Sequence, residues 1–240
     1  MISSDDKAMN TPSLSIVIPV LNEASSIVPV LERLQEFRRQ GAEVIVVDGG
    51  SSDGTLERAR PLADCVTTSL RGRGRQMNVG AAQATGDVLL FLHADTLLPP
   101  SALALIREAV GNGACWGRFD VRIEGSIGGL GMVAFMMNWR SRLTGIATGD
   151  QAIFVTREAF RRRGGYPVIP LMEDIVFSGW MRQESPPACL TEKVTTSGRR
   201  WEKHGLLRTI LMMWWLRIRF YFGASPNDLA REYGYVPHET

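Results

Sequence analysis

Three short apolar runs constrain what this chain can fold into. They are LSIVIPV at residues 14–20, EVIVVD at 43–48 and VLLFL at 88–92. Runs this rich in Val, Ile and Leu are typical of parallel strands that are covered on both faces. Helical patterns begin at residues 27, 53, 73 and 99, and a short strand is expected at 65–68. This alternation predicts an α/β fold, an open and mostly parallel sheet with helices on both faces.

The regular alternation of strand and helix patterns ends at Gly113. The stretch WGRFDVRIE at 116–124 alternates like a half-buried strand, and AIFVT at 152–156 is a second expected strand. A helix is expected over residues 126–143. The helices of the first half are expected to run from 27 to Gly41, to about Leu62, over 73–85 and over 99–110.

Charge and cysteine content limit the class of partner and compartment. The 27 basic residues among 240 are nearly balanced by 25 acidic ones, and a net charge of +2 argues against nucleic-acid binding. The cysteines are few and widely spaced, which is typical of a reducing compartment. The polar N-terminus does not have the pattern of a signal or transit peptide. We therefore expect a cytoplasmic protein.

Two apolar segments, 127–139 and 206–222, are too short to span a membrane. The second, LLRTILMMWWLRIRFYF, is apolar nearly all round a helical wheel. Two interpretations stay open for it. It is either buried against the domain, or it lies in a membrane interface as part of a peripheral protein on the inner face of the membrane.

Acidic residues follow three of the expected strands. Glu23, Asp48 and Asp95 lie where the first, second and fourth strands end. Ligands of such sheets bind outside the carboxyl ends of the strands, and clustered carboxylates call for a cation or for donor groups. Arginines 71, 73 and 75 are expected at the same edge. Acids that can hold Mg²⁺ or Mn²⁺ beside arginines that can bind phosphate predict a nucleoside-diphosphate pocket.

Two other interpretations of these loops fail. A dinucleotide-binding fold needs G-x-G-x-x-G after the first strand, where this chain has VLNEASS without a glycine. A phosphatase of the D-x-D-x-T type needs a nucleophilic aspartate where this chain has His93 in HADT.

The order and spacing of these motifs resemble the family 2 glycosyltransferases of the GT-A fold. The matching stretches are SIVIPVLNE (15–23), VIVVDGGSSDGT (44–55), GRGRQMNVGAAQATGD (72–87), FLHADT (91–96), GDQAIFV (149–155), GGYP (164–167), MED (172–174) and RRW (199–201). The chain is most similar to small bacterial members with HAD in place of D-x-D. The resemblance implies a polar tail (1–13), a GT-A domain (14–203) and a C-terminal helical extension (204–240).

The resemblance implies a role for each matching residue on the donor side. Pro19, Asn22, Glu23 and Asp48 would bind the nucleoside, and Arg73 and Arg75 would contact phosphate. Asp95 matches the metal-binding acid of D-x-D. His93 departs from the family pattern, so it would either ligate the cation or bind ribose or phosphate.

On the acceptor side, Asp174 matches the base that takes the proton of the acceptor hydroxyl, and Glu173 would orient it. Asp150 and Gln151 would touch the donor sugar or the acceptor. Arg200 would bind the diphosphate, and Trp201 would form a wall of the acceptor site.

The family thus implies metal-dependent transfer of a sugar, with inversion, from a nucleotide sugar to an acceptor hydroxyl. UDP is favoured over GDP only by its frequency in the family, and the apolar segments motivate a lipid-linked acceptor. Two alternatives stay open: a degenerate nucleotide-sugar-binding or membrane-docking protein, and a sugar nucleotidyltransferase. The second is disfavoured because VLNEASS lacks a basic, glycine-rich loop.

Overall fold

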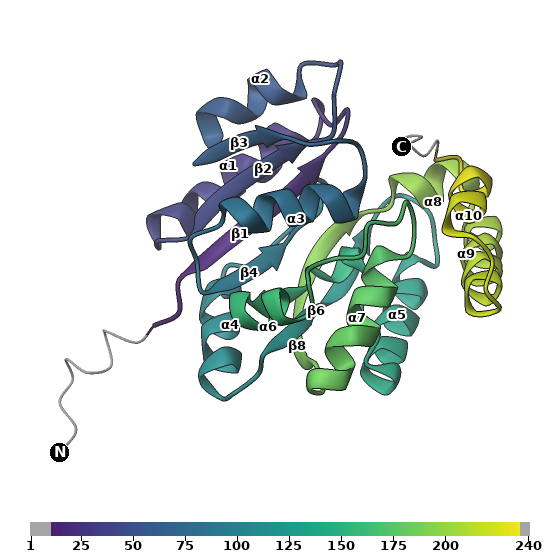
Figure 1. Cartoon of the computed structure of the whole chain (residues 1–240). Coiled ribbons are helices and arrows are strands. Elements are labelled where there is room, and N and C mark those ends of the chain that lie inside the picture. The colour runs from purple at the N-terminus through teal and green to yellow at the C-terminus, as the bar shows by residue number, and fades with distance from the viewer. Residues whose placement is uncertain (1–10, 236–240) are drawn as a thin grey trace.

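The apolar runs form adjacent strands of an eight-stranded sheet in the computed structural model, which describes residues 11–235 (Figure 1). The strand order is β3-β2-β1-β4-β7-β6-β8-β5, and the first four strands are mutually parallel. β7 is antiparallel to both of its neighbours, and β8 runs parallel to β6. The strands are β1 (Leu14–Val20), β2 (Glu43–Asp48), β3 (Cys65–Thr68), β4 (Val88–Phe91), β5 (Thr96–Leu97), β6 (Trp116–Glu124), β7 (Phe154–Thr156) and β8 (Ala188–Ser197).

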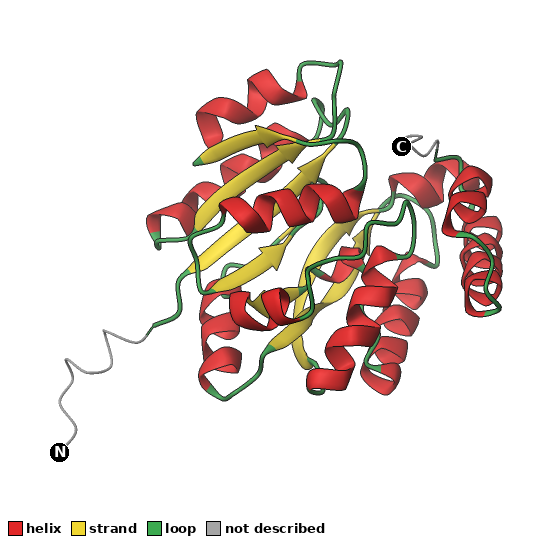
Figure 2. Ribbon diagram, in the orientation of Figure 1, coloured by secondary structure: helices red, strands yellow, loops and turns green. Residues whose placement is uncertain are grey.

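Helices cover both faces of the sheet, as the α/β pattern predicts (Figure 2). They are α1 (Ile27–Arg39), α2 (Thr55–Ala59), α3 (Arg73–Gln83), α4 (Ala102–Gly111), α5 (Leu130–Thr144), α6 (Arg157–Arg162), α7 (Glu173–Glu184), α8 (Arg199–His204), α9 (Leu206–Tyr221) and α10 (Pro226–Glu232), with 3-10 turns η1 (Arg60–Leu62) and η2 (Gly149–Gln151).

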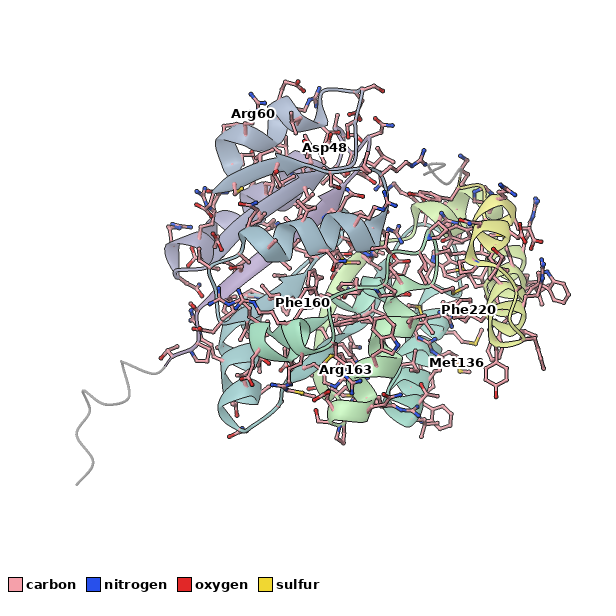
Figure 3. The ribbon with its side chains drawn as sticks, viewed as in Figure 1. Asp48, Arg60, Met136, Phe160, Arg163 and Phe220 are labelled. Carbon is pink, nitrogen blue, oxygen red and sulfur yellow. The ribbon has the colours of Figure 1, made fainter. Side chains whose placement is uncertain are left out.

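The core has a layer on each side of the sheet because successive strand residues point to opposite faces. Ile16 and Ile18 of β1 pack on the α1 side, whereas Val17 packs on the α3 side. The α3-side layer contains an aromatic cluster to which Phe160 belongs (Figure 3). The sequences of these strands are almost uniformly apolar because both faces of the sheet are buried.

Several predicted boundaries need correction. The helix predicted over 73–85 ends at Gln83, the one over 99–110 begins at Ala102, and the one over 126–143 spans Leu130–Thr144. The strand predicted at 152–156 begins at Phe154. β5 and β8 were not predicted.

The prediction that 116–124 is half-buried is wrong for its first six residues, which are all buried. Arg118 and Asp120 are polar yet enclosed, because they pair with each other and Asp120 also pairs with Arg142. The alternation therefore reflects an internal ion pair at Arg118 and Asp120, and it marks a solvent-facing side only at Arg122 and Glu124.

The C-terminal extension forms α9 and α10, which pack on the loop before α7 through Met172, Leu216 and Leu229. Burial of α9 as a whole is not observed, since only Thr209 and Leu216 are fully buried. No helix within residues 11–235 is long and apolar enough to cross a membrane. Of the predicted polar tail 1–13, residues 1–10 lie outside the described range, as do residues 236–240 of the extension.

The contact between α3 and the sheet generates a prediction. A Cβ on Gly80 would lie 2.3 Å from Cγ1 of Val17 and 3.0 Å from Cγ2 of Val47. We expect Gly80→Ala to lower the free energy of unfolding by about 1–3 kcal/mol through overpacking. Gly131→Ala, in α5 with open space around it, is the control and should raise stability by up to about 1 kcal/mol. Chemical denaturation measures both, and equal stabilities would contradict the packing of α3.

Candidate functional site

The carboxyl ends of β1, β2 and β4 lie at one edge of the sheet, as the parallel register requires. One guanidinium joins two of the three predicted acids there. Nη2 of Arg199 lies 3.4 Å from Oε2 of Glu23 and 3.5 Å from Oδ2 of Asp95. Arg199 was not among the predicted site residues, although it is the first residue of the RRW motif.

Asp48 has a different surrounding. It is buried, and its Oδ2 accepts hydrogen bonds from the backbone N–H groups of Gly50 and Ser51. Asn22 cross-links the same turn, because its backbone N–H donates to Ser51 and its side-chain oxygen accepts from the N–H of Ser52. The loops after β1 and β2 thus form one hydrogen-bonded unit. Pro19, predicted to line the nucleoside, is buried in β1.

Helix α3 is held over this edge by two amide side chains. Nε2 of Gln76 donates to the carbonyls of Val20 and Val47, each at 2.8 Å, so it bridges β1 and β2. Asn78 exchanges two hydrogen bonds with the backbone of Tyr166 in the GGYP loop. A Cβ on Gly74 would lie 2.4 Å from the carbonyl oxygen of Pro167, so glycine allows α3 to approach that loop closely.

Arg73 and Arg75 lie in the first turn of α3. Arg73 is exposed at the protein surface. Desolvation by the neighbouring chain works to lower the pKa of Arg73, but the carboxylates of Glu173, Asp150 and Asp174 raise it overall. Arg73 is therefore a fixed cation among acids of the second half of the chain.

The MED motif places its two acids differently. Glu173 is 4% exposed, and burial together with the neighbouring Asp174 raises the pKa of Glu173 to about 7, against an opposing effect of Arg73. Asp174 is half-buried, and its Oδ2 accepts from the N–H of Gly149 at 2.9 Å. Asp174 is thus the more accessible carboxylate, and Glu173 lies in the interior beside it.

The loop 148–151 connects Asp174 with the strand end that carries His93. Nδ1 of His93 lies 3.2 Å from Oδ1 of Asp150. Burial works to raise the pKa of Asp150, but the hydrogen bond with His93 and the charges of Arg73 and Arg200 lower it. A Cβ on Gly149 would lie 2.3 Å from Nε2 of His93, so the imidazole packs directly on this loop.

Gln151 does not take the predicted position. Its side chain is fully buried and caps η2, with Oε1 accepting from the N–H of Thr148 at 3.2 Å. The expected contact of Gln151 with the sugar or the acceptor is therefore corrected: its amide fixes the loop that presents Asp150.

The RRW motif lies in α8, beside the C-terminal helix pair. The guanidinium of Arg200 stacks on the ring of Tyr233 with 3.9 Å to its centroid, and that of Arg71 stacks on Tyr235. Trp201 is half-buried against the core. The two tyrosines were missed, since nothing in the local sequence indicates that this segment returns to the site.

Three non-glycine residues in the site loops have left-handed backbone conformations. Their φ angles are +54° at Asn22, +48° at Ala152 and +72° at Met172. Each adjoins a site residue, namely Glu23, the 149–151 turn and Glu173. Such conformations cost energy and persist where the surroundings enforce them, so their clustering supports a functional site.

The residues fit a cation that is bound together with a diphosphate. Within residues 11–235 no group of three or more His, Cys, Asp or Glu side chains could hold a metal by itself. Asp95 is partly exposed at the strand exit. One carboxylate combined with substrate phosphates is a set of ligands that Mg²⁺ commonly uses.

Comparison with known proteins identifies the family. Residues 15–162, more than half of the chain, match the family described as glycosyl transferase family 2. The chain therefore belongs to glycosyl transferase family 2.

Curated relatives agree with this assignment. The glycosyltransferase AglE of Haloferax volcanii is 36% identical over 93 residues, covering 35% of this chain and 31% of the relative. A PGL/p-HBAD biosynthesis glycosyltransferase of Mycobacterium bovis BCG is 35% identical over 111 residues, covering 43% of each chain. The matches thus span less than half the length of these relatives.

Solved structures share the GT-A fold. The mannosyltransferase PcManGT of Pyrobaculum calidifontis, in complex with GDP-Man and Mn²⁺, has a TM-score of 0.60 at 22% identity, covering 77% of this chain and 56% of that one. Glucosyl-3-phosphoglycerate synthase of Mycobacterium tuberculosis, with Mn²⁺, UDP and phosphoglyceric acid, has a TM-score of 0.59 at 19% identity, covering 79% and 71%. At these identities the likeness shows the fold alone.

The position of Glu173 generates a prediction about pH. The pKa of Glu173 is about 7 in the folded protein and about 4.5 when unfolded, so folding favours the protonated form. Its contribution to stability is full below pH 4.5 and is lost as the pH rises towards 7. We expect the difference in free energy of unfolding, Glu173→Gln minus wild type, to grow over this range by a few kcal/mol at most.

Denaturant titration across the pH range measures that difference. Glu108→Gln, on the exposed side of α4, is the control. Its difference in free energy of unfolding from the wild type should not change with pH. A flat profile for Glu173→Gln as well would contradict the raised pKa of Glu173.

Proposed function

We propose that this chain transfers a sugar, with inversion, from a nucleotide-diphosphate sugar to a lipid-linked acceptor hydroxyl. The observation that carries the proposal is the convergence at one sheet edge of two sets of residues. Glu23, Asp48 and Asp95 come from the parallel half of the sheet, and Asp150 and Asp174 come from the second half. Two substrates can therefore meet between them.

The parallel half is proposed to bind the donor. The unit formed by Asn22, Glu23 and the turn after Asp48 would hold the nucleoside. UDP is the favoured nucleotide and GDP is the alternative. Arg73, Arg75 and Arg200 supply positive charge for the diphosphate, because guanidinium groups match the geometry of phosphate oxygens.

Asp95 would hold the divalent cation, Mn²⁺ or Mg²⁺, jointly with the donor's phosphates. When bound, the cation stabilises the negative charge that grows on the leaving diphosphate. His93 is assigned to Asp150 rather than to the cation, because its Nδ1 faces that carboxylate and its Nε2 packs on Gly149. In this role His93 positions the 148–151 loop.

Asp174 is proposed as the base. Its carboxylate accepts the proton of the acceptor hydroxyl while the hydroxyl oxygen forms a bond to the anomeric carbon. The bond from that carbon to the diphosphate breaks, the nucleoside diphosphate leaves with the electron pair, and one displacement inverts the configuration. The N–H of Gly149 keeps Asp174 directed into the site. Trp201 would wall the acceptor.

Two substitutions separate binding from chemistry. Asp174→Asn should lower turnover by about 10²–10⁴-fold with unchanged nucleotide affinity, because only the proton acceptor is lost. Asp95→Ala should lower both the turnover and the affinity for the nucleotide. Calorimetric titration of UDP and GDP, with and without Mn²⁺, measures binding. Release of UDP or GDP from UDP-glucose, UDP-N-acetylglucosamine and GDP-mannose, with water as acceptor, measures turnover.

Glu108→Gln is the control for both measurements and should behave as wild type. Near-normal turnover of Asp174→Asn would contradict its assignment as base. Absence of nucleotide binding under every condition would contradict the proposed function as a whole.

A further inference from the structure

Helices α5 and α9 each carry an apolar stripe that faces solvent. In α5 the stripe comprises Met132, Phe135, Met136, Trp139 and Leu143, and in α9 it comprises Leu207, Leu211, Trp214, Trp215 and Ile218. The spacing of three or four residues places each set on one side of its helix. Phe135 is 63% exposed and Trp214 is 59% exposed. Stripes of this kind normally face a core, so exposed ones mark an interaction surface.

The two helices lie side by side. A Cβ on Gly129, just before α5, would lie 2.6 Å from Cδ2 of Leu206 at the start of α9. Farther along, Arg140 of α5 lines the same cleft as several residues of α9. Figure 3 labels Met136 on α5 and Phe220 on α9 at the same side of the molecule. We call this joint surface the α5–α9 face.

The cleft in this face has a volume of about 240 Å³ and combines apolar walls with two arginines. Its walls come from α9 and the residue after it, and Arg140 and Arg217 supply its charge. The apolar lining residues are Trp214, Ile218, Tyr221 and Phe222.

In the part of the chain that the structure describes, neither arginine of the cleft forms an ion pair with a carboxylate. Nε and Nη2 of Arg140 are buried without a hydrogen-bond acceptor among the described residues. Burial and the charge of Arg217 lower the pKa of Arg140 to about 10, and burial also lowers the pKa of Arg217. Asp174 and Asp150 work in the opposite direction on both arginines. Two half-buried cations at one cleft repel each other, and an anion between them would offset that repulsion.

A phosphate attached to an apolar chain matches both properties of the cleft. The arginines complement the phosphate, and the surrounding Trp, Tyr and Phe side chains are those enriched at membrane interfaces. The helix that forms the cleft also packs on the MED motif, because Leu216 of α9 and Met172, next to Glu173, belong to one buried cluster. A headgroup in the cleft would therefore lie on the acceptor side of the site.

We propose that the α5–α9 face docks on a membrane and that Arg140 and Arg217 bind the phosphate of a lipid headgroup there. The proposal deepens the proposed function, on which it rests in taking the acceptor to be presented from the membrane. Docking itself needs neither donor nor turnover.

Flotation of the full-length protein with vesicles tests the proposal. The probes are vesicles of phosphatidylcholine alone and of phosphatidylcholine mixed with phosphatidylglycerol. We expect binding to the anionic vesicles. Arg140→Gln/Arg217→Gln should lose about ten-fold or more of that binding, since each basic residue near an anionic surface contributes about five-fold. Trp214→Gln/Trp215→Gln should also weaken binding to the anionic vesicles, because the apolar contact with the membrane is lost.

The matched control is Arg33→Gln/Arg161→Gln, which removes the same charge from exposed positions on α1 and α6. The binding of this variant to anionic vesicles should stay within about two-fold of that of the wild type. Equal losses in the two arginine pairs would overturn the proposal, because general attraction would then explain the binding. Failure of the wild type to float would overturn it too, as would self-association through this face without vesicle binding.

Nucleotide binding by the same preparations keeps the two proposals apart. A protein that binds UDP or GDP with Mn²⁺ but ignores vesicles would leave the proposed transfer intact and reject the docking face. A protein that floats with anionic vesicles but binds no nucleotide would support the docking face and reject the proposed transfer.

Discussion

Charge compensation at the carboxyl edge of the sheet is the interaction on which the site depends. Acids from separate loops gather there, and like charges in such proximity would repel if nothing opposed them. Arginines from α3 and α8 lie among them and draw the two halves of the chain together. The clearest example is Arg199, which follows β8 and yet contacts Glu23 after β1 and Asp95 after β4. The same arrangement keeps positive charge where a diphosphate would bind.

The hydrogen-bonded amides explain how this edge keeps its shape. Gln76 donates hydrogen bonds to the carbonyls of Val20, the last residue of β1, and Val47 in β2. Asn78 fixes the GGYP loop through the backbone N–H and carbonyl of Tyr166. Buried amides of this kind hold a definite geometry because any displacement leaves a polar group unpaired. The position of Arg73 therefore follows from its neighbours in α3.

The parallel half of the fold could be predicted because its signal is local. The runs at 14–20 and 43–48 match β1 and β2 residue for residue, and parallel strands that end together bring Glu23 and Asp95 to one edge. By contrast, the sequence ACLTEKVTTS of β8 has little apolar content, and this strand forms through pairing with the distant β6.

The remaining errors at the site concern direction rather than place. Sequence reasoning overlooked Arg199, which is adjacent to Arg200 and chemically identical to it, and it expected Gln151 to face a ligand. Which neighbour faces inward is set by loop conformation and long-range contacts, and these leave little trace in the local pattern. The periodicity of α9 likewise predicts a helix but not which of its sides meets the protein.

The left-handed backbone at Asn22, Ala152 and Met172 has a consequence for the energetics of recognition. Each such residue costs about 1–3 kcal/mol, and the folded scaffold bears that cost before any substrate arrives. The loops around the site are thus already ordered, and little entropy remains to be lost when they close on a ligand. Glycine would ease the backbone at any of the three, but it would remove the hydrogen bond of Asn22 to Ser52 or the buried packing of Met172, and it would leave the site loops less rigid.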